Sequence, residues 1–131
     1  MNISICIPAY SRAIYLAPLL RSIFDQNSFN FEIVIAEDCS PERDQITDIV
    51  MQFESEFPGI IRYELNKENL GYDANIRRLI ELSKGDYCLF LGNDDLLAPN
   101  ALQALSEILQ RFSNCGVIVR TYATFEESPL E

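Results

Sequence analysis

The sequence predicts an α/β fold in which a mainly parallel sheet carries helices on both faces, in a single domain of residues 1–131. Two observations indicate this fold. Five short apolar runs alternate along the chain with segments whose apolar residues recur at helical spacing. Strict alternation of strands and helices favours parallel pairing, because each helix then crosses a face of the sheet between two strands.

The predicted strands are short and rich in apolar or β-branched residues. They are ISICIPA (3–9), FEIVIAE (31–37), IIRYEL (60–65), DYCLFLG (86–92) and GVIVRTYATF (116–125). The second, fourth and fifth are nearly continuous in such residues, which is typical of strands buried on both faces. Cys6 and Cys88 lie inside two of these runs, so we expect them to be small core residues.

Four helices are expected between the strands. The first has an apolar face made by Leu16, Leu19, Leu20, Ile23 and Phe24. The second should begin at Ser40-Pro41, because Ser is a good N-cap and Pro is favoured at the first helical position. Gly85 should end the third helix as a C-cap residue. The fourth should start at Pro99, with an apolar face of Leu102, Leu105, Leu109 and Phe112.

Composition and charge limit the kinds of partner. The 131 residues, of which 48% are hydrophobic, are enough for one globular domain with its own core. Twenty acidic residues against ten basic ones give a net charge of -10, which disfavours a nucleic-acid groove or an anionic membrane surface. A small phosphorylated ligand is compatible with this charge when a metal or a local cation offsets the repulsion.

The cysteines and the N-terminus indicate a cytoplasmic setting. The four cysteines form no C-x-x-C pair, and the chain has no His to complete a mixed zinc site. Reduced thiols are the simplest expectation. The N-terminal sequence has no signal-peptide pattern, and no apolar run approaches the ~18 residues that a membrane span needs.

Polar segments follow the first four predicted strands. They are PAYSR (8–12), EDCS (37–40), NKENLGYDAN (66–75) and GNDD (92–95). Because the carboxyl ends of parallel strands share one edge of the sheet, these segments should lie together there. Ligands of open α/β sheets bind at that edge, near a change in strand order.

Four carboxylates are expected at this edge, together with polar groups from the other loops. The carboxylates are Glu37, Asp38, Asp94 and Asp95, and the polar groups are Asn69, Asn75 and Arg12. Clustered carboxylates repel one another unless a cation joins them. Mg2+ or Mn2+ prefers carboxylate oxygens and keeps coordination positions open for phosphate. Gly92 would let the backbone approach such a ligand closely.

Purely structural interpretations compete with this one. Asp94 and Asp95 precede a helix, so they could instead complement its dipole. Asp38 could be a turn residue before the Ser40 cap, and Gly71 could supply a turn. Arg12 could be a solvated surface charge and Tyr10 a rim aromatic without a ligand.

Taken together and in this order, the strand-end motifs resemble family 2 glycosyltransferases with the Rossmann-like GT-A fold. The family's P-x-Y-N-R appears as Pro8-Ala9-Tyr10-Ser11-Arg12, and its D-D-x-S appears as Glu37-Asp38-Cys39-Ser40. Its E-N-x-G appears as Glu68-Asn69-Leu70-Gly71, and its A-x-G-[DE]-Y as Ser83-Lys84-Gly85-Asp86-Tyr87. Its L-D-x-D-D appears as Leu91-Gly92-Asn93-Asp94-Asp95, with Pro99 four residues on. The resemblance covers residues 2 to 125.

The resemblance implies transfer of a sugar from a UDP-, GDP- or dTDP-type donor to a sugar or glycolipid acceptor, as in polysaccharide biosynthesis. It implies that Pro8, Ala9 and Tyr10 line the base pocket, that Asp38 bonds the base and that Arg12 lies near the nucleotide. Asp94 would hold Mn2+ or Mg2+ on the diphosphate, and Asp95 would orient the metal or the donor sugar. The other implied substrate-binding residues are Glu37, Asn69, Gly71, Asn75 and Asn93.

The sequence departs from the family pattern at three places. Gly92 replaces the first Asp of D-x-D, Glu37 replaces the first acid of D-D-x-S, and Asn75-Ile76-Arg77 stands where the family has A-R-N. An inverting transfer needs a base to deprotonate the acceptor. In the family this base and the acceptor site lie beyond this point, so the chain resembles a donor-binding half with its catalytic residue unknown. Dimerisation through an uncovered apolar face, or peripheral attachment to the inner face of a membrane, would fit such a half.

Two other classes are open from the sequence. One is a non-catalytic nucleotide-binding or assembly domain. The short length and Gly92, which replaces the first Asp of D-x-D, favour this class. The other is a receiver-like phosphoacceptor domain, which also gathers acids at strand ends. The second is less favoured, because the first strand ends in Pro8-Ala9-Tyr10 without an acid.

Overall fold

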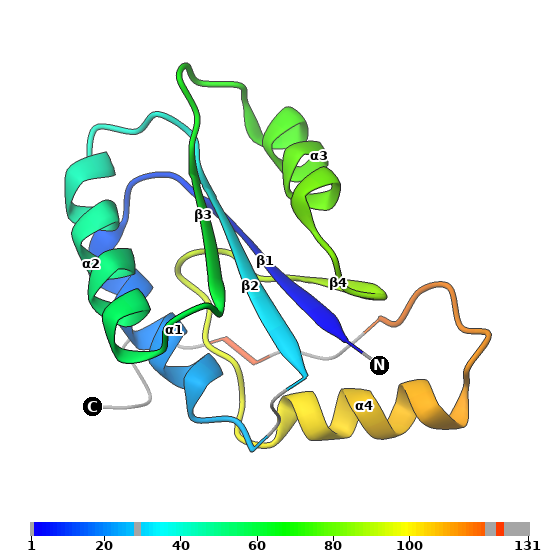
Figure 1. Ribbon diagram of the computed structural model, residues 1–131. Helices are drawn as coiled ribbons and strands as arrows, with labels where there is room; N and C mark the ends of the chain where they lie inside the picture. The colour runs from blue at the N-terminus through cyan, green and yellow to red at the C-terminus, as the bar shows by residue number, and fades with distance from the viewer. Residues whose placement is uncertain (1, 28–29, 120–122, 125–131) are drawn as a thin grey trace.

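The computed structural model describes residues 2–27, 30–119 and 123–124 (Figure 1). The elements are β1 (Ile3–Ala9), the 3-10 helix η1 (Ala13–Tyr15), α1 (Leu16–Phe24), β2 (Phe31–Glu37), α2 (Arg43–Glu56), β3 (Ile61–Leu65), α3 (Tyr72–Leu82), β4 (Tyr87–Phe90) and α4 (Ala101–Arg111). The predicted alternation of strands and helices is therefore confirmed from β1 to α4.

All strand pairs of the sheet are parallel, as predicted, and the strand order is β3-β2-β1-β4. Ile3 of β1 lies in register with Phe31 of β2 on one side and Tyr87 of β4 on the other. From β1 the chain moves outward through β2 and β3, and then returns to place β4 on the opposite side of β1. The strand order therefore reverses between β1 and β4, which is where ligands bind in open α/β sheets.

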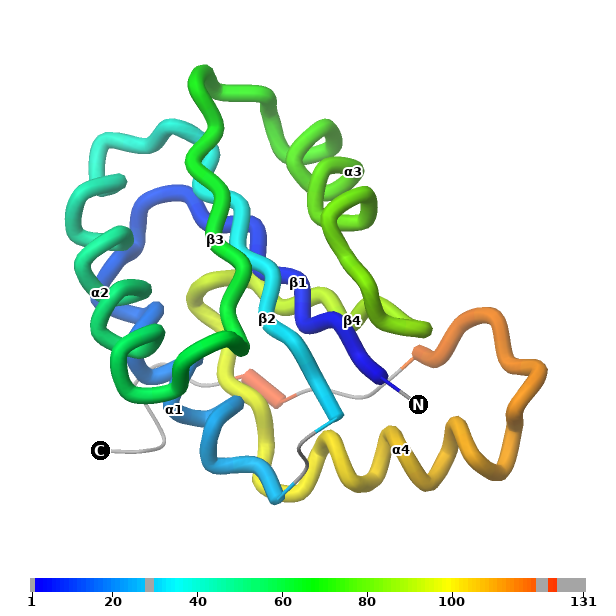
Figure 2. Tube along the Cα trace, viewed as in Figure 1, coloured from blue at the N-terminus to red at the C-terminus, as the bar shows by residue number. Residues whose placement is uncertain are grey.

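Helices cover both faces of the sheet. The isoleucines of β1 and β2 that alternate toward one face pack with buried residues of α1, α2 and α4 in the main core. On the opposite face Cys6, Val34 and Ala36 pack against Leu79 of α3 in a smaller core. Figures 1 and 2 show α3 on the opposite side of the strands from α1 and α2. The period-two alternation of each strand thus supplies both cores at once.

The predicted strand 116–125 is wrong where the structure describes it. Residues 116–119 and 123–124 form no strand, and residues 120–122 and 125 lie outside the described ranges. Val117 and Val119 are 80% and 93% exposed, and between them Ile118 packs only partly against the main core. Strand propensity alone did not suffice here, because it measures fit to a half-buried surface.

Three helix boundaries differ from the predictions. Helix α2 begins at Arg43, two residues after Pro41, although the Ser40 hydroxyl accepts a bond from the Glu42 N–H at 3.3 Å. Helix α4 begins at Ala101, after Asn100 in the left-handed region. Phe112 lies beyond the end of α4 and is exposed, so it is not part of the core stripe.

Gly85 does not cap α3, which ends at Leu82. A Cβ atom on Gly85 would lie 2.7 Å from the backbone nitrogen and the hydroxyl of Ser4. The Gly85 N–H donates to that hydroxyl at 2.8 Å. Gly85 is therefore required for close approach of the α3–β4 connection to β1.

All four cysteines are free thiols, as expected, and Cys6 is buried while Cys88 is only partly so. Among the helices of the described residues, none has both the length and the apolar character to cross a membrane.

Candidate functional site

The loops that follow the strands begin in contact with one another. The Asp38 N–H donates to the Ala9 carbonyl at 2.9 Å, and the Asn66 N–H donates to the Glu37 carbonyl at 2.9 Å. Across the other side of β1, the Leu91 N–H donates to the Cys6 carbonyl at 3.0 Å. These bonds continue the parallel ladders past the strand ends, so the segments after all four strands lie along one edge of the sheet.

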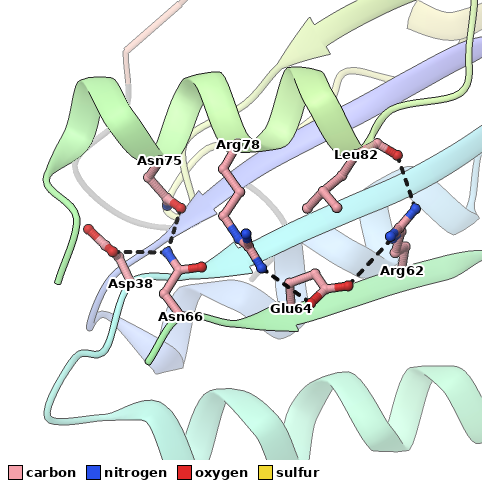
Figure 3. Close-up of polar contacts among 7 residues, drawn as sticks. All are labelled: Asp38, Arg62, Glu64, Asn66, Asn75, Arg78 and Leu82. Atoms are coloured by element: carbon pink, nitrogen blue, oxygen red, sulfur yellow. Dashed lines mark hydrogen bonds and ion pairs between the residues drawn. The ribbon is translucent and has the colours of Figure 1, made fainter. Parts of the chain in front are cut away.

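Asp38 belongs to a buried hydrogen-bond network in which Asn66 joins it to Asn75 (Figure 3). Its side chain is 4% exposed. Its Oδ1 accepts from Asn66 Nδ2 at 2.9 Å and from the Leu70 N–H at 2.8 Å, and its Oδ2 accepts from the Gly71 N–H at 3.0 Å. The Asp38 carbonyl also accepts from Asn69 Nδ2 at 3.0 Å. Asp38 thus fastens the β3–α3 loop to the end of β2, and Oδ2 retains acceptor capacity for a ligand N–H.

Two buried amides extend this network toward the sheet. Asn66 Nδ2 also donates to Asn75 Oδ1 at 2.8 Å, and Asn75 Nδ2 donates to the Ala36 carbonyl at 3.0 Å. Both side chains are buried, so in this structure Asn75 supports Asp38 rather than lining an open surface. Its contact with a substrate stays a prediction. Asn66 was not among the predicted site residues, and only its place directly after a strand could have pointed to it.

Two further residues shape the turns around Asp38. Glu37 is fully buried, and its carboxylate accepts from the Cys39 and Ser40 N–H groups at 3.1 and 2.7 Å. Gly71 has φ of 87°, a conformation that side chains disfavour, and nothing lies within 4 Å of the point that a Cβ atom would occupy there. Gly71 is the N-cap residue of α3, so its positive φ gives this glycine a local structural role, while substrate contacts of both residues stay predictions.

The loop after β1 is held from two sides. Ser11 and Arg12 are consecutive non-glycine residues with φ of 53°. Glu42, at the N-cap of α2, accepts from the Arg12 N–H at 2.9 Å and from the Ala13 N–H at 3.3 Å. On the other side Asn93 Nδ2 donates to the Ser11 carbonyl at 2.7 Å. The helix pattern that predicts α2 gives no sign of this tie between α2 and η1, so it was missed.

The carboxylates after β4 meet at Gly92. Asp95 Oδ2 accepts from the Gly92 N–H at 2.8 Å, and the Asp95 N–H donates to the Gly92 carbonyl at 3.0 Å, which closes a tight turn. A Cβ atom on Gly92 would lie 3.2 Å from Asp94 Oδ1 and 3.2 Å from Asp95 Oδ2. The missing side chain therefore leaves a small cradle that two carboxylate oxygens flank.

Arg12 reaches this cradle from the neighbouring strand end. Its Nη1 donates to Asp94 Oδ2 in an ion pair between the loops after β1 and β4. Tyr10 is half exposed at the same edge, next to Ala9, which is buried, and Pro8, which is partly buried. The structure therefore brings Arg12, Asn93, Asp94 and Asp95 together, and a second group forms around Asp38.

The donor set is suited to Mg2+ or Mn2+. The described residues hold no group of three or more His, Cys, Asp or Glu side chains placed to bind a metal ion. Mg2+ is usually held by one or two carboxylates plus phosphate oxygens and water. Asp94 and Asp95 at the Gly92 cradle match that arrangement, because they supply two carboxylates and leave the remaining positions open.

An apolar groove lies elsewhere, between β4, α4 and the segment after α4. It has a volume of about 400 Å³, and its lining includes Tyr87, Leu89, Leu105, Leu109 and Val117. Its lining contains none of the carboxylates of the sheet edge, and includes the first residue of β1 and all of β4. Its apolar lining does not suit a charged nucleotide. The polar edge of the sheet is therefore the candidate site.

The sequence matches the family described as Glycosyl transferase family 2 over residues 4–130. The chain belongs to this glycosyltransferase family. Membership confirms the resemblance of the strand-end motifs and leaves the receiver-like alternative without support. The family is one of glycosyltransferase enzymes.

Curated relatives of this glycosyl transferase family 2 chain are considerably longer. The chain is 38% identical over 109 residues to abequosyltransferase RfbV of Salmonella typhimurium, covering 83% of this chain and 33% of the relative. It is 33% identical over 117 residues to an uncharacterized glycosyltransferase of Haemophilus influenzae, covering 88% of this chain and 37% of the relative. The chain therefore spans about a third of the length of these relatives.

Solved structures establish the GT-A fold. The S. aureus protein TarS, residues 1–349, matches with a TM-score of 0.78 and 23% identity, over 86% of this chain and 33% of that one. TarS has also been solved in complex with UDP and with UDP-GlcNAc. The mannosyltransferase PcManGT from Pyrobaculum calidifontis, in complex with GDP-Man and Mn2+, matches with a TM-score of 0.71 and 17% identity, over 79% of this chain and 30% of that one.

Proposed function

We propose that this chain is the donor-binding part of a metal-dependent, inverting glycosyltransferase whose donor is a nucleoside diphosphate sugar. The observation that carries the proposal is the meeting of Arg12 with Asp94 and Asp95 at the strand-order reversal between β1 and β4. The negative charge of a diphosphate is stabilised by positive groups. This edge offers two, a guanidinium and the divalent metal that its carboxylates suit.

The base of the nucleotide would bind on the Asp38 side of the edge. Asp38 Oδ2 accepts one bond within the protein, from the Gly71 N–H, and would accept another from an N–H on the base. Tyr10 is half exposed and offers a ring face for stacking, with Pro8 and Ala9 behind it. Complexes of TarS with UDP and of PcManGT with GDP-Man support a nucleotide donor as the ligand.

The diphosphate and the metal would bind on the Asp94 side. Asp94 and Asp95 would hold Mn2+ or Mg2+, and the complex of PcManGT with Mn2+ supports the use of a divalent metal. When bound, the metal neutralises charge that develops on the leaving diphosphate. Asn93 holds the loop after β1 through the Ser11 carbonyl, on the Asp94 side of the site. Asn69 holds the end of β2 through the Asp38 carbonyl, on the side of the proposed base pocket.

The acceptor would be a sugar or a glycolipid, and an inverting transfer would need a base to take the proton from its hydroxyl. We assign no described residue to that role. Glu37 and Glu42 are committed to backbone N–H groups, Asp38 is assigned to the base, and Asp94 and Asp95 are assigned to the metal.

Calorimetric titration of the folded chain with UDP, GDP, CDP and dTDP, each with and without Mn2+, tests the proposal. At least one nucleotide should bind, and more tightly with Mn2+. Asp38→Ala and Asp94→Ala should each abolish the binding, whereas Asp25→Asn, an exposed carboxylate beyond the end of α1, should not. Undiminished binding in both site variants, or no binding by any nucleotide to a chain shown to be folded, would contradict it.

A further inference from the structure

Arg12 and Asp94 form an ion pair across the point where the strand order reverses. They are 82 positions apart in the sequence, and each lies in the loop directly after its strand. The Arg12 side chain is 63% exposed and the Asp94 side chain is 39% exposed. The pair therefore lies open to solvent, at the place where a nucleotide diphosphate would bind.

The backbone around Arg12 is fixed although its side chain is exposed. The left-handed conformation of Arg12 is secured by its N–H bond to Glu42, and the preceding carbonyl of Ser11 is bonded to Asn93. Since Asn93 directly precedes Asp94, the backbones of the two ion-pair partners are tied together. With the backbone held and the side chain exposed, a change of rotamer alone would bring the guanidinium to a neighbouring acceptor.

The ion pair competes with a metal for the same carboxylate. Asp94 Oδ2 accepts from the guanidinium, and the positive charge of Arg12 repels a cation that approaches this oxygen. A diphosphate offers the guanidinium a more highly charged acceptor, to which Arg can donate in a bidentate way. The ion pair is thus expected to exchange when a diphosphate arrives.

We propose that Arg12 covers the metal-binding carboxylate of Asp94 in the empty site and moves to the diphosphate when the donor binds. Arg12 would thereby couple the binding of the metal to the binding of the nucleotide. The inference rests on the proposed function, because it takes Asp94 as a metal ligand. Coupling of this kind is reciprocal, so the nucleotide raises the affinity for the metal by the same factor as the metal raises that for the nucleotide.

The proposal predicts that loss of the Arg12 guanidinium raises the affinity for the metal and lowers the affinity for the nucleotide. Removal of the guanidinium in Arg12→Gln should raise the affinity for Mn2+ alone about two- to fivefold, the range of an exposed ion pair. The same change should weaken UDP binding in the presence of Mn2+ about tenfold or more, because a charged hydrogen bond to phosphate is lost. A merely structural role of Arg12 would not raise the affinity for the metal.

The experiment measures free Mn2+ by electron paramagnetic resonance during titration of the full chain, with and without saturating UDP, GDP or dTDP. Four proteins are compared: the unchanged chain, Arg12→Gln, Arg12→Lys and Arg111→Gln. Arg111 lies at the end of α4, away from the site edge, and controls for the loss of one positive charge. Arg12→Lys keeps the charge beside Asp94 but loses the planar fork, so it should retain weak binding of Mn2+ alone and lose part of the coupling.

The expected result is tighter binding of Mn2+ alone in Arg12→Gln than in the unchanged chain and in Arg111→Gln, together with a smaller nucleotide effect. If the unchanged chain binds a nucleotide with Mn2+ but Arg12→Gln binds Mn2+ alone no more tightly, the inference is overturned and the proposed function is not. If the unchanged chain binds no nucleotide under any condition, the inference about Arg12 and the proposed function are both overturned. Circular dichroism of each variant establishes that it is folded.

Discussion

Asn66 donates a hydrogen bond from Nδ2 to Asp38 Oδ1 at 2.9 Å and a second from the same nitrogen to Asn75 Oδ1 at 2.8 Å. Through these two hydrogen bonds the amide links the end of β2, the end of β3 and the first turn of α3. It lies in a buried environment, where an unmet polar group is costly. The Asp38 carboxylate, the proposed partner of the base, is therefore held in place by buried amides.

Replacement of Asn66 by Ala should lower the free energy of unfolding by about 1–3 kcal/mol, because Asp38 and Asn75 each lose a buried donor. Nucleotide binding should weaken as well, since the Asp38 carboxylate would no longer be fixed. Urea denaturation and calorimetry measure the two effects. Asn27→Ala is the matched control, because it removes an exposed amide bond to Asn100. Equal effects of both variants would contradict the structural role of Asn66.

Gly92→Asp should raise the affinity for Mn2+ at least about fivefold, because it places a third carboxylate beside two others, and one charge at about 4 Å contributes ~1 kcal/mol even in water. A Cβ at this position meets only the flexible ends of Asp94 and Asp95, at 3.2 Å. Gly92→Asn has the same shape without the charge. If both variants bind Mn2+ equally well, the cradle is not a metal site.

Gly85→Ala should destabilise the fold by about 1–3 kcal/mol, the usual effect of overpacking. Its new Cβ would lie 2.7 Å from the Ser4 backbone nitrogen, which cannot move without shifting β1. Gly116→Ala provides the control, because nothing lies within 4 Å of its added Cβ. It should change the free energy of unfolding by less than about 0.5 kcal/mol, as measured by urea denaturation. A similar stability of both variants would contradict the close approach.

The link between α1 and α2 should depend on pH. Arg21 donates to Glu56 through two bonds of 2.8 and 3.0 Å, and this bonding holds the pKa of the Glu56 carboxyl below its ordinary value. A lowered pKa stabilises the fold above the pKa of the unfolded chain, and this contribution is lost as pH falls through the lower, folded value. Glu56→Gln should therefore reduce the urea midpoint at pH 7 but not in acid below that value.

Glu81→Gln, an exposed change on α3, is the control for the pH experiment. It should leave the urea midpoint nearly unchanged at both pH values. A Glu56→Gln variant whose deficit is the same at neutral and acid pH would contradict the ionic contribution, and would assign the effect to packing alone.

The parts of the fold that could be predicted are those with a periodic signal. Ile3, Ile5 and Ile7 alternate along a strand, and Leu16, Leu19 and Leu20 recur on a helix, so burial of each set follows from local spacing. The run 116–125 carried the same kind of signal without forming a strand in its described part. Local pattern does not specify whether a neighbouring surface exists to bury it.

The sequence predicted where the residues of the candidate site lie better than it predicted which residues contact one another. Asp38, Asp94 and Asp95 were expected at one sheet edge because the strands before them are parallel. The roles of Asn66 and Glu42 were not, because their partners are distant in the sequence: Asp38 lies 28 residues from Asn66, and Arg12 lies 30 from Glu42. Such contacts depend on how loops close over one another, and residue type alone does not encode this.

The most direct test of the central claim is a nitrogen-15 amide spectrum of the chain titrated with UDP and Mg2+, followed by trace Mn2+. UDP should shift the amides of Leu70 and Gly71, which bond to Asp38, and Mn2+ should broaden those of residues 92–95 because the metal lies beside them. Shifts confined to the apolar groove of β4 and α4, or broadening that leaves residues 92–95 sharp, would contradict a donor site at the carboxyl edge of the sheet.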